Sequence, residues 1–219
     1  MGTLYIVATP IGNLADITLR ALRILKEVDL ILCEDTRVTK KLLDHYQIKT
    51  PTMSYHQHSG TVKSEKVLNQ LNQGKALALA TDAGTPGVCD PGGKIIAEAV
   101  LAGHQVIPVP GPSAMAAAVA IAGLPLDKFL FLGFLPHKKG RQTLLKKIAE
   151  SDYPVILYES VHRIEKLLSE LNQSSRIVVC RELTKKFETI YRGTAEAVKA
   201  KLKPSEIKGE FTVIIEGKK

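Results

Sequence analysis

The strongest constraint on the fold is a repeated alternation of two sequence patterns. Short apolar runs rich in β-branched residues recur along the chain, and amphipathic stretches such as 161–171 separate them. Each run suits one buried strand, and the stretches between them suit helices. Because parallel neighbours need crossover helices, the alternation predicts an α/β fold with mostly parallel pairing in the first half. The predicted strands are 4–8, 30–33, 76–80, 106–109, 129–132, 155–158, 177–180 and 211–215.

Two domains of comparable size are predicted. A chain of 219 residues lies between one large domain and two small ones. The sequence Gly123-Leu124-Pro125 interrupts a helix pattern after the alanine-rich segment 114–122, which places the boundary there. The prediction is an N-terminal α/β domain over 1–122 and a C-terminal α/β domain over 123–219.

Several classes of protein are excluded by composition. No apolar run approaches the roughly 18 residues of a membrane span, and the N-terminus lacks a secretory signal, so a cytoplasmic protein is expected. The three cysteines share no metal-type spacing, which favours reduced thiols. His56 and His58 have no third ligand nearby in the sequence, so no metal is expected.

The net charge of +8 is concentrated in the second half of the chain. Residues 1–110 carry 11 basic and 10 acidic side chains, whereas residues 111–219 carry 19 and 12. Such a surplus is compatible with a polyanionic partner, although many basic proteins bind none.

Four loops in the first half follow predicted strands, where ligands bind in parallel α/β sheets. The most informative is TDAGTPGVCDPG at 81–92, whose glycines and prolines shape a rigid turn around a carboxylate at Asp82. The others are VATPIGNLADIT at 7–18, with Asp16 or Thr18 as the helix N-cap, CEDTR at 33–37 and VPGPSA at 109–114. An ordinary turn, a solvated acidic turn and a simple N-cap at Ser113 are the respective alternatives for these three.

Three loops in the second half bring basic residues to strand ends. They are FLGFLPHKKGR at 131–141, YESVHR at 158–163 and RELTKKFE at 181–188. Basic groups at such an edge can hold phosphates, although a charge run is usually a solvated face. The candidate RNA-binding residues are Arg37, Lys138, Lys139, Arg141, Arg163, Arg181, Lys185 and Lys186.

Taken together and in this order, these motifs resemble the ribosomal RNA small subunit methyltransferase I family of the tetrapyrrole-methylase superfamily. The resemblance spans almost the whole chain. It implies two α/β domains, the second with a mixed sheet, and S-adenosylmethionine bound in the cleft between them. It also implies a homodimer that methylates the ribose 2'-oxygen of a cytidine in the decoding region of small-subunit (16S) rRNA. Many relatives extend further at the C-terminus, so an accessory RNA-binding segment is expected to be absent.

The resemblance also assigns individual residues. The turn at Pro10 and Gly12 matches the first glycine-rich turn of the superfamily, although the usual G-x-G-P-G-D is reduced here to TPIGN. The cofactor-binding residues implied are Pro10, Gly12, Asp82, Ala83, Gly84, Thr85, Ser113, Ala114 and Tyr158.

Methyl transfer from a sulfonium depends on positioning, and a ribose hydroxyl needs a group that removes its proton. Glu34, Asp35 and Glu159 are the candidate catalytic bases. Two alternatives remain open: a tetrapyrrole or a modified protein side chain as the methyl acceptor, and a non-enzymatic RNA-binding module.

Overall fold

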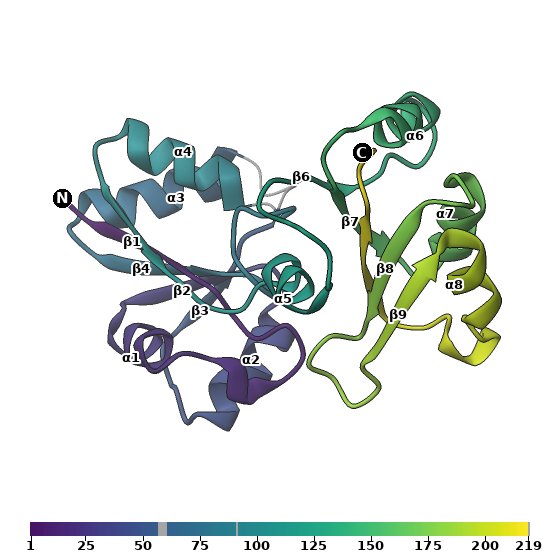
Figure 1. Ribbon diagram of the computed structural model, residues 1–219. Coiled ribbons are helices and arrows are strands. Elements are labelled where there is room, and N and C mark those ends of the chain that lie inside the picture. Colours follow the sequence, from purple (N-terminus) through teal and green to yellow (C-terminus); the bar gives the residue numbers. More distant parts are fainter. Residues whose placement is uncertain (57–60, 91, 219) are drawn as a thin grey trace. The chain divides into compact units, whose positions relative to one another are not determined.

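The computed structural model describes residues 1–56, 61–90 and 92–218, and these residues divide into two compact units (Figure 1). The first unit covers Met1–Ser113 and the second Ala114–Lys219. The division therefore falls at the start of the alanine-rich helix, whereas the sequence places the boundary at its end. This helix, α5 (Ala114–Ile121), packs against strand β10 (Glu210–Ile215) of the second unit, which explains the difference.

The first unit contains a five-stranded sheet in the order β3-β2-β4-β1-β5, and every pair in it is parallel. The strands are β1 (Thr3–Val7), β2 (Leu30–Cys33), β3 (Thr52–Ser54), β4 (Ala76–Ala80) and β5 (Gln105–Val109). The connections carry η1 (Leu14–Asp16), α1 (Leu19–Glu27), α2 (Thr36–His45), α3 (Thr61–Asn72) and α4 (Gly92–Leu101).

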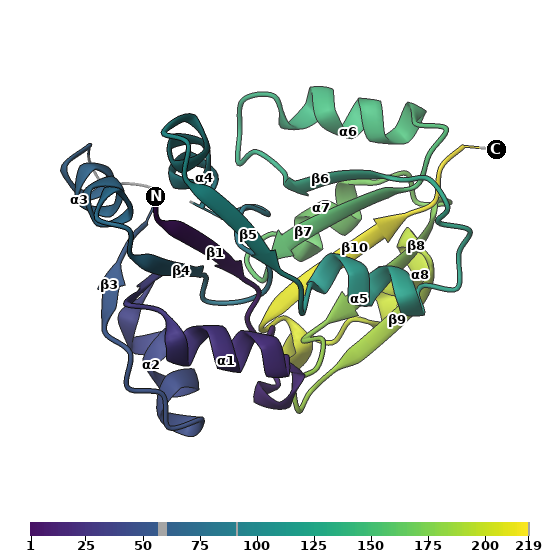
Figure 2. The same ribbon diagram turned by 90° about the vertical axis from the view of Figure 1, so that its left-hand side faces the viewer.

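The helices of this unit cover opposite faces of its sheet (Figure 2). Leu25 of α1 and Leu43 of α2 share a core with Val7, whereas Leu71 of α3 and Ile95 of α4 share another with Leu4. Because successive side chains of a strand point to opposite faces, the continuous apolar strands serve both cores.

The second unit contains a mixed five-stranded sheet in the order β6-β7-β10-β8-β9. Only β6 and β7 pair in parallel; the other pairs are antiparallel. The strands are β6 (Leu130–Phe134), β7 (Val155–Ser160), β8 (Arg176–Arg181), β9 (Thr189–Thr194) and β10. The predicted fold class, with a parallel first sheet and a mixed second one, is confirmed.

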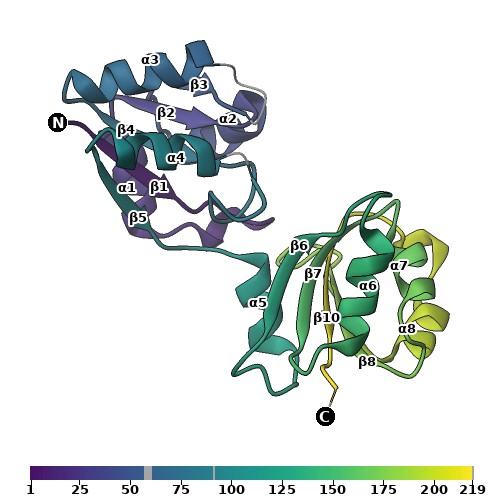
Figure 3. The same cartoon turned by 90° about the horizontal axis from the view of Figure 1, so that it is seen from above.

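Helices α6 (Arg141–Glu150), α7 (Ile164–Glu170) and α8 (Ala195–Lys201) pack on one face of the second sheet, and the 3-10 turn η2 (Pro204–Glu206) precedes β10. Their core includes Leu145, Leu167 and Val198 together with Leu157 and Val213 of the strands. Helix α5 lies on the opposite face (Figure 3). The carboxyl ends of β7 and β8 lie at the same edge of the sheet, because both strands are antiparallel to β10.

Candidate functional site

The chain reverses its winding direction around β4. Strands β1 and β2 lead into α1 and α2 on one face of the sheet, whereas β4, which lies between them, leads into α4 on the other. The loops that leave β4 and its two neighbours therefore separate to opposite faces. Such a switch in the connections opens a crevice at the carboxyl ends of parallel strands, and this is where α/β proteins bind ligands.

The turns at this edge are fixed to one another. The N–H of Thr9 donates to the carbonyl of Gly84 at 2.9 Å, and the N–H of Gly84 donates back to the carbonyl of Thr9 at 3.1 Å. The buried hydroxyl of Thr9 donates to the carbonyl of Thr81 at 3.0 Å. Thr85 reaches the third turn, where its hydroxyl donates to the carbonyl of Pro112 at 3.1 Å. The predicted strand-end turns thus form one rigid backbone surface.

Two glycines permit this close approach. Gly84 has a φ of +84°, a conformation in which a side chain is strained. A Cβ at Gly111 would lie 3.0 Å from the Cβ of Ala8, tighter than side chains normally pack. Among the cofactor-binding candidates, Pro10 and Gly84 are buried, Thr85, Ser113 and Ala114 are half-buried, and Gly12 and Ala83 are exposed.

Asp82 connects this surface to the acidic turn after β2. Its Oδ1 accepts a hydrogen bond from the N–H of Asp35 at 3.1 Å, so the two predicted strand-end motifs meet. Burial raises the pKa of Asp82, an effect that the bond from Asp35 partly offsets. Burial likewise raises the pKa of Glu34, and the nearby carboxylates of Asp82, Asp90 and Asp35 add to this rise. Glu34 and Asp82 are therefore carboxylates that hold a proton more readily than usual.

Asp35 behaves differently from these two. Hydrogen bonds from Arg37 lower the pKa of Asp35 to about 2, and its Oδ2 lies 2.6 Å from the guanidinium. Asp35 is also the N-cap of α2, because Oδ1 accepts from the N–H of Arg37 at 2.8 Å. This carboxylate anchors a helix, and Arg37 is its exposed partner.

In the second unit, Tyr158 supports the start of α5. Its hydroxyl accepts a hydrogen bond from the N–H of Met115, in the first turn of the helix, at 3.1 Å. The rings of Phe131 and Phe134 of β6 pack against it with centroids 5.1 and 5.6 Å away.

Glu159 lies in a buried ion network. Its side chain is fully buried; Oε1 lies 2.7 Å from Nη2 of Arg163, and Oε2 lies 3.5 Å from Nη1 of Arg141. Arg141 also binds Glu170, with Nη2 to Oε2 at 2.7 Å. No sequence pattern pointed to Glu170, because it lies in another helix 29 residues further along the chain. The network leaves Glu159 without contact to solvent, which does not suit the catalytic base predicted from the sequence.

The two arginines of this network also hold the loop after β6. Arg163 donates to the carbonyl of Leu135 at 2.8 Å, and Arg141 donates to that of Pro136 at 3.4 Å. The loop continues into the exposed residues Lys138 and Lys139. The arginines therefore shape the loop from within while the lysines project from it.

The predicted RNA-binding residues thus separate into two groups. Arg141 and Arg181 are buried, and the side chain of Arg163 is only 13% exposed, so these arginines occupy structural positions and not the phosphate-facing ones expected from the sequence. Lys185 is half-buried between Glu182 and Glu210. Lys138, Lys139, Lys186 and Arg37 are exposed.

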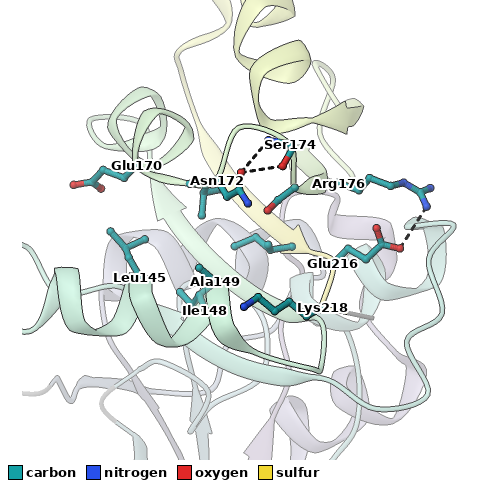
Figure 4. Close-up of a pocket in the computed structure, with 13 residues that line it drawn as sticks. Leu145, Ile148, Ala149, Glu170, Asn172, Ser174, Arg176, Glu216 and Lys218 are labelled. Atoms are coloured by element: carbon teal, nitrogen blue, oxygen red, sulfur yellow. Dashed lines mark hydrogen bonds and ion pairs between the residues drawn. The ribbon is translucent and has the colours of Figure 1, made fainter.

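A pocket of about 290 Å³ lies at the other end of the second sheet (Figure 4). It is formed by α6, the end of α7, the start of β8 and the end of β10, so it is remote from the carboxyl ends of β7 and β8. Arg176 and Glu216 pair across its rim at 3.4 Å, and Asn172 bonds Ser174 there. None of the predicted site residues lines it.

Neither a metal centre nor a membrane span is found within the described residues. No group of three or more His, Cys, Asp or Glu side chains there is arranged to hold a metal ion, and His58 lies outside those residues, as does Pro91 of the glycine-rich loop. No helix in the same ranges has the length and apolar character needed to cross a membrane.

The fold is that of known methyltransferases. The structure of diphthine synthase matches with a TM-score of 0.76 at 16% identity, covering 99% of this chain and 90% of that one. A uroporphyrin III C-methyltransferase from Thermus thermophilus matches with a TM-score of 0.68 at 18% identity, covering 97% of each chain. Residues 3–199 match the family described as Tetrapyrrole (Corrin/Porphyrin) Methylases. Fold and sequence together define the class: an α/β methyltransferase of the tetrapyrrole-methylase type.

More similar relatives narrow this class. A protein of Escherichia coli O157:H7 is 46% identical over all of this chain and 79% of its own length. A protein of Thermotoga maritima is 41% identical over the full length of both. Each is named Ribosomal RNA small subunit methyltransferase I, as is one of Halalkalibacterium halodurans, 44% identical over 99% of this chain and 76% of its own. The chain therefore belongs to the ribosomal RNA small subunit methyltransferase I family, whose methyl donor is S-adenosylmethionine.

Proposed function

We propose that this protein methylates the ribose 2'-oxygen of a cytidine in the decoding region of small-subunit rRNA. The observation that carries the proposal is the identity of 41–46% with the ribosomal RNA small subunit methyltransferases named above, over essentially the whole chain. The exposed lysines of the loop after β6 support an RNA acceptor, because exposed cations at such a loop can bind backbone phosphates.

The methyl donor fits the carboxyl edge of the first sheet. Its adenosine needs close approach to backbone, and the turns around Gly84 and Gly111 expose backbone without side chains in the way. Its ribose hydroxyls and cationic centres need a carboxylate, which Asp82 supplies beside these turns. Bound there, S-adenosylmethionine supplies an electrophilic methyl group. Pro10, Gly12, Ala83, Thr85, Ser113, Ala114 and Tyr158 remain the other proposed contacts.

Among the three predicted bases, Glu34 is best suited to take the proton of the ribose hydroxyl. A general base works best when its pKa approaches the working pH, and burial beside other carboxylates raises the pKa of Glu34. Asp35 is held ionised by Arg37, and both oxygens of Glu159 face arginines inside the second unit. Glu34 also lies next to Asp35, whose N–H binds the proposed cofactor ligand Asp82.

A labelling experiment tests the acceptor. The protein is incubated with tritiated S-adenosylmethionine and either small subunits or deproteinised small-subunit rRNA, and the RNA is then hydrolysed in alkali. A 2'-O-methyl group blocks cleavage of the adjacent phosphodiester, so the label should appear in alkali-resistant dinucleotides. Label in mononucleotides, or only in a tetrapyrrole or protein acceptor, would contradict the proposal.

Two pairs of variants test the proposed cofactor-binding and RNA-binding residues, and the first pair concerns the cofactor. Asp82→Asn should weaken binding of S-adenosylmethionine in calorimetry, whereas Asp44→Asn, an exposed aspartate on α2, should not. Equal affinities in the two variants would remove Asp82 from the site.

Lys138→Ala with Lys139→Ala should weaken rRNA binding and flatten its salt dependence by a slope of about 2. Lys146→Ala with Lys147→Ala removes the same charge from α6 and serves as its control. Equal losses in both double variants would show that net charge alone, and not this loop, binds the RNA. The proposed homodimer predicts twice the mass of the 23.9 kDa chain in light scattering, and a mass of one chain would refute it.

A further inference from the structure

We propose that Phe187, with Lys186 over one face of its ring and Lys208 on a neighbouring segment, is a stacking site for an unpaired base of the RNA substrate. The inference rests on the proposed RNA substrate and adds a contact for it in the second unit. Phe187 lies in the loop 182–188 that joins β8 to β9 and extends beyond the end of the sheet (Figure 1). Sequence analysis singled out the lysines of this loop but not its aromatic residue.

The ring is presented to solvent. Phe187 is 64% exposed, more than any other described aromatic residue, whereas the neighbouring Leu183 and Tyr191 are buried. Burial of a phenylalanine side chain stabilises a fold, and this loop gains little of that stabilisation from Phe187. An exposed ring beside buried apolar neighbours is therefore available for a partner.

Several hydrogen bonds and ion pairs hold the loop that carries this ring. Arg181 is 7% exposed and donates to the carbonyl of Phe187 at 3.0 Å. Lys185 binds Glu182 at 2.9 Å and Glu210 at 2.8 Å, which ties the loop to β10. The N–H of Thr184 donates to Glu188. These contacts fix the backbone on both sides of the ring.

The backbone of this loop is also strained. Glu182 and Thr184 have φ values of 53° and 65°, a region that residues other than glycine adopt only where contacts enforce it. The hydrogen bonds named above therefore hold the loop in one conformation.

Two exposed lysines come from segments close to the ring. Nζ of Lys186 lies over the Phe187 ring, 5.7 Å from its centroid, and leaves the other face of the ring open to a base. The guanidinium of Arg181 binds the backbone carbonyls of both Phe187 and Lys208, so the backbones of these two residues lie close together. Lys186 and Lys208 are exposed, and within the part of the chain that the structure describes neither forms an ion pair. Lys185, by contrast, is already paired with carboxylates.

An exposed aromatic ring with lysines nearby favours unpaired RNA over duplex RNA. Bases in duplexes are stacked already, whereas single-stranded or looped bases stack on aromatic side chains while lysines bind the adjacent phosphates. The geometry therefore points to a single-stranded or looped segment of rRNA.

The protein offers a direct optical test, because its sequence contains no tryptophan. Phe187→Trp places a single indole in the loop, and Tyr153→Trp places one at the opposite end of the same sheet, at a residue that is 47% exposed. Titration with a single-stranded oligoribonucleotide from the small-subunit rRNA should quench the indole fluorescence of the Phe187→Trp variant but not that of the Tyr153→Trp variant. A duplex of equal length should quench neither. Equal quenching in the two variants, or stronger quenching by the duplex, would overturn the inference.

The affinity test uses the full chain and small-subunit rRNA. Loss of one base–aromatic stack corresponds to about 5- to 150-fold in Kd, so Phe187→Ala should weaken rRNA binding by that factor while Phe187→Tyr retains it. Binding of S-adenosylmethionine should be the same in both. An unchanged Kd in Phe187→Ala would overturn the inference. A lower mass of that variant in light scattering would also overturn it, because the ring would then lie between copies of this chain. If the unmodified protein bound no rRNA, the proposed function itself would fail.

Discussion

Replacement of Glu159 by glutamine should destabilise the second unit strongly. Glu159 is fully buried between Arg141, whose side chain is 3% exposed, and Arg163, at 13%. Removing one partner of such a pair costs about 3–5 kcal/mol, because a buried charge is left uncompensated. Arg141 keeps Glu170 and Arg163 keeps the carbonyl of Leu135, so we expect the lower end, about 3 kcal/mol. For a chain of this length the melting temperature should fall by about 6–12 °C.

Urea denaturation followed by circular dichroism measures this change. Glu216→Gln is the control: its partner Arg176 is 63% exposed, and we expect a loss of at most about 1 kcal/mol. Glu159→Gln should also raise the KM for rRNA more than that for S-adenosylmethionine, because the arginines hold the loop that carries Lys138. If Glu159→Gln unfolded like the unmodified protein yet lost methyl transfer, the structural assignment would be refuted and Glu159 would be the base after all.

Further predictions concern Glu34 and Gly84 in the first unit. The kcat/KM for rRNA should fall in acid with a midpoint above the usual glutamate range, because burial, and to a smaller extent the carboxylates of Asp82 and Asp90, raise the pKa of Glu34. The variant Glu34→Gln should retain little activity at any pH. Since the folded state binds this proton more tightly than the unfolded state, stability declines as the pH rises through that range, and Glu34→Gln should melt higher than the unmodified protein at neutral pH. A normal midpoint would remove Glu34 as the base. Gly84→Ala should cost about 1–2 kcal/mol, since its φ is +84°, and an unchanged urea midpoint would contradict this.

The alternation of apolar runs was sufficient to predict the buried strands, and each of the eight predicted runs overlaps a strand of the structure, with one residue outside it at the end of 4–8 and one at the start of 129–132. The two strands that it missed, β3 and β9, lie at sheet edges. β3 has three residues and none is buried; in β9 only Tyr191 is, and the strand contains Arg192 and Gly193. A hydrophobic pattern detects strands through burial, so strands that bury little leave no such signal.

The first-unit site followed from topology as well as from composition. Parallel strands bring their carboxyl ends to one edge, so the sequence singled out the strand-end loops that contain Asp35 and Asp82, and in the structure a hydrogen bond joins these two loops. Sequence could not show that β4 lies between β1 and β2 and leads to the opposite face, because strand order depends on long-range pairing. That order explains why the loop after β4, and not the loop after β3, forms the centre of the site.

The sequence pattern could not show which basic residues of the second half are buried and which are exposed. The chemistry of arginine and lysine explains the difference. The buried ones are arginines that bind several acceptors at once: Arg181 joins the carbonyls of Lys208 and Phe187. A planar guanidinium spans two acceptors, whereas a lysine ammonium is more strongly hydrated and stays at the surface. Arg181→Lys should therefore cost about 1–3 kcal/mol although the charge is conserved, while Lys138→Arg, at an exposed site, should cost less than about 0.5 kcal/mol. Equal urea midpoints for the two variants would show that charge, and not the two-pronged geometry of the guanidinium, is what this position requires.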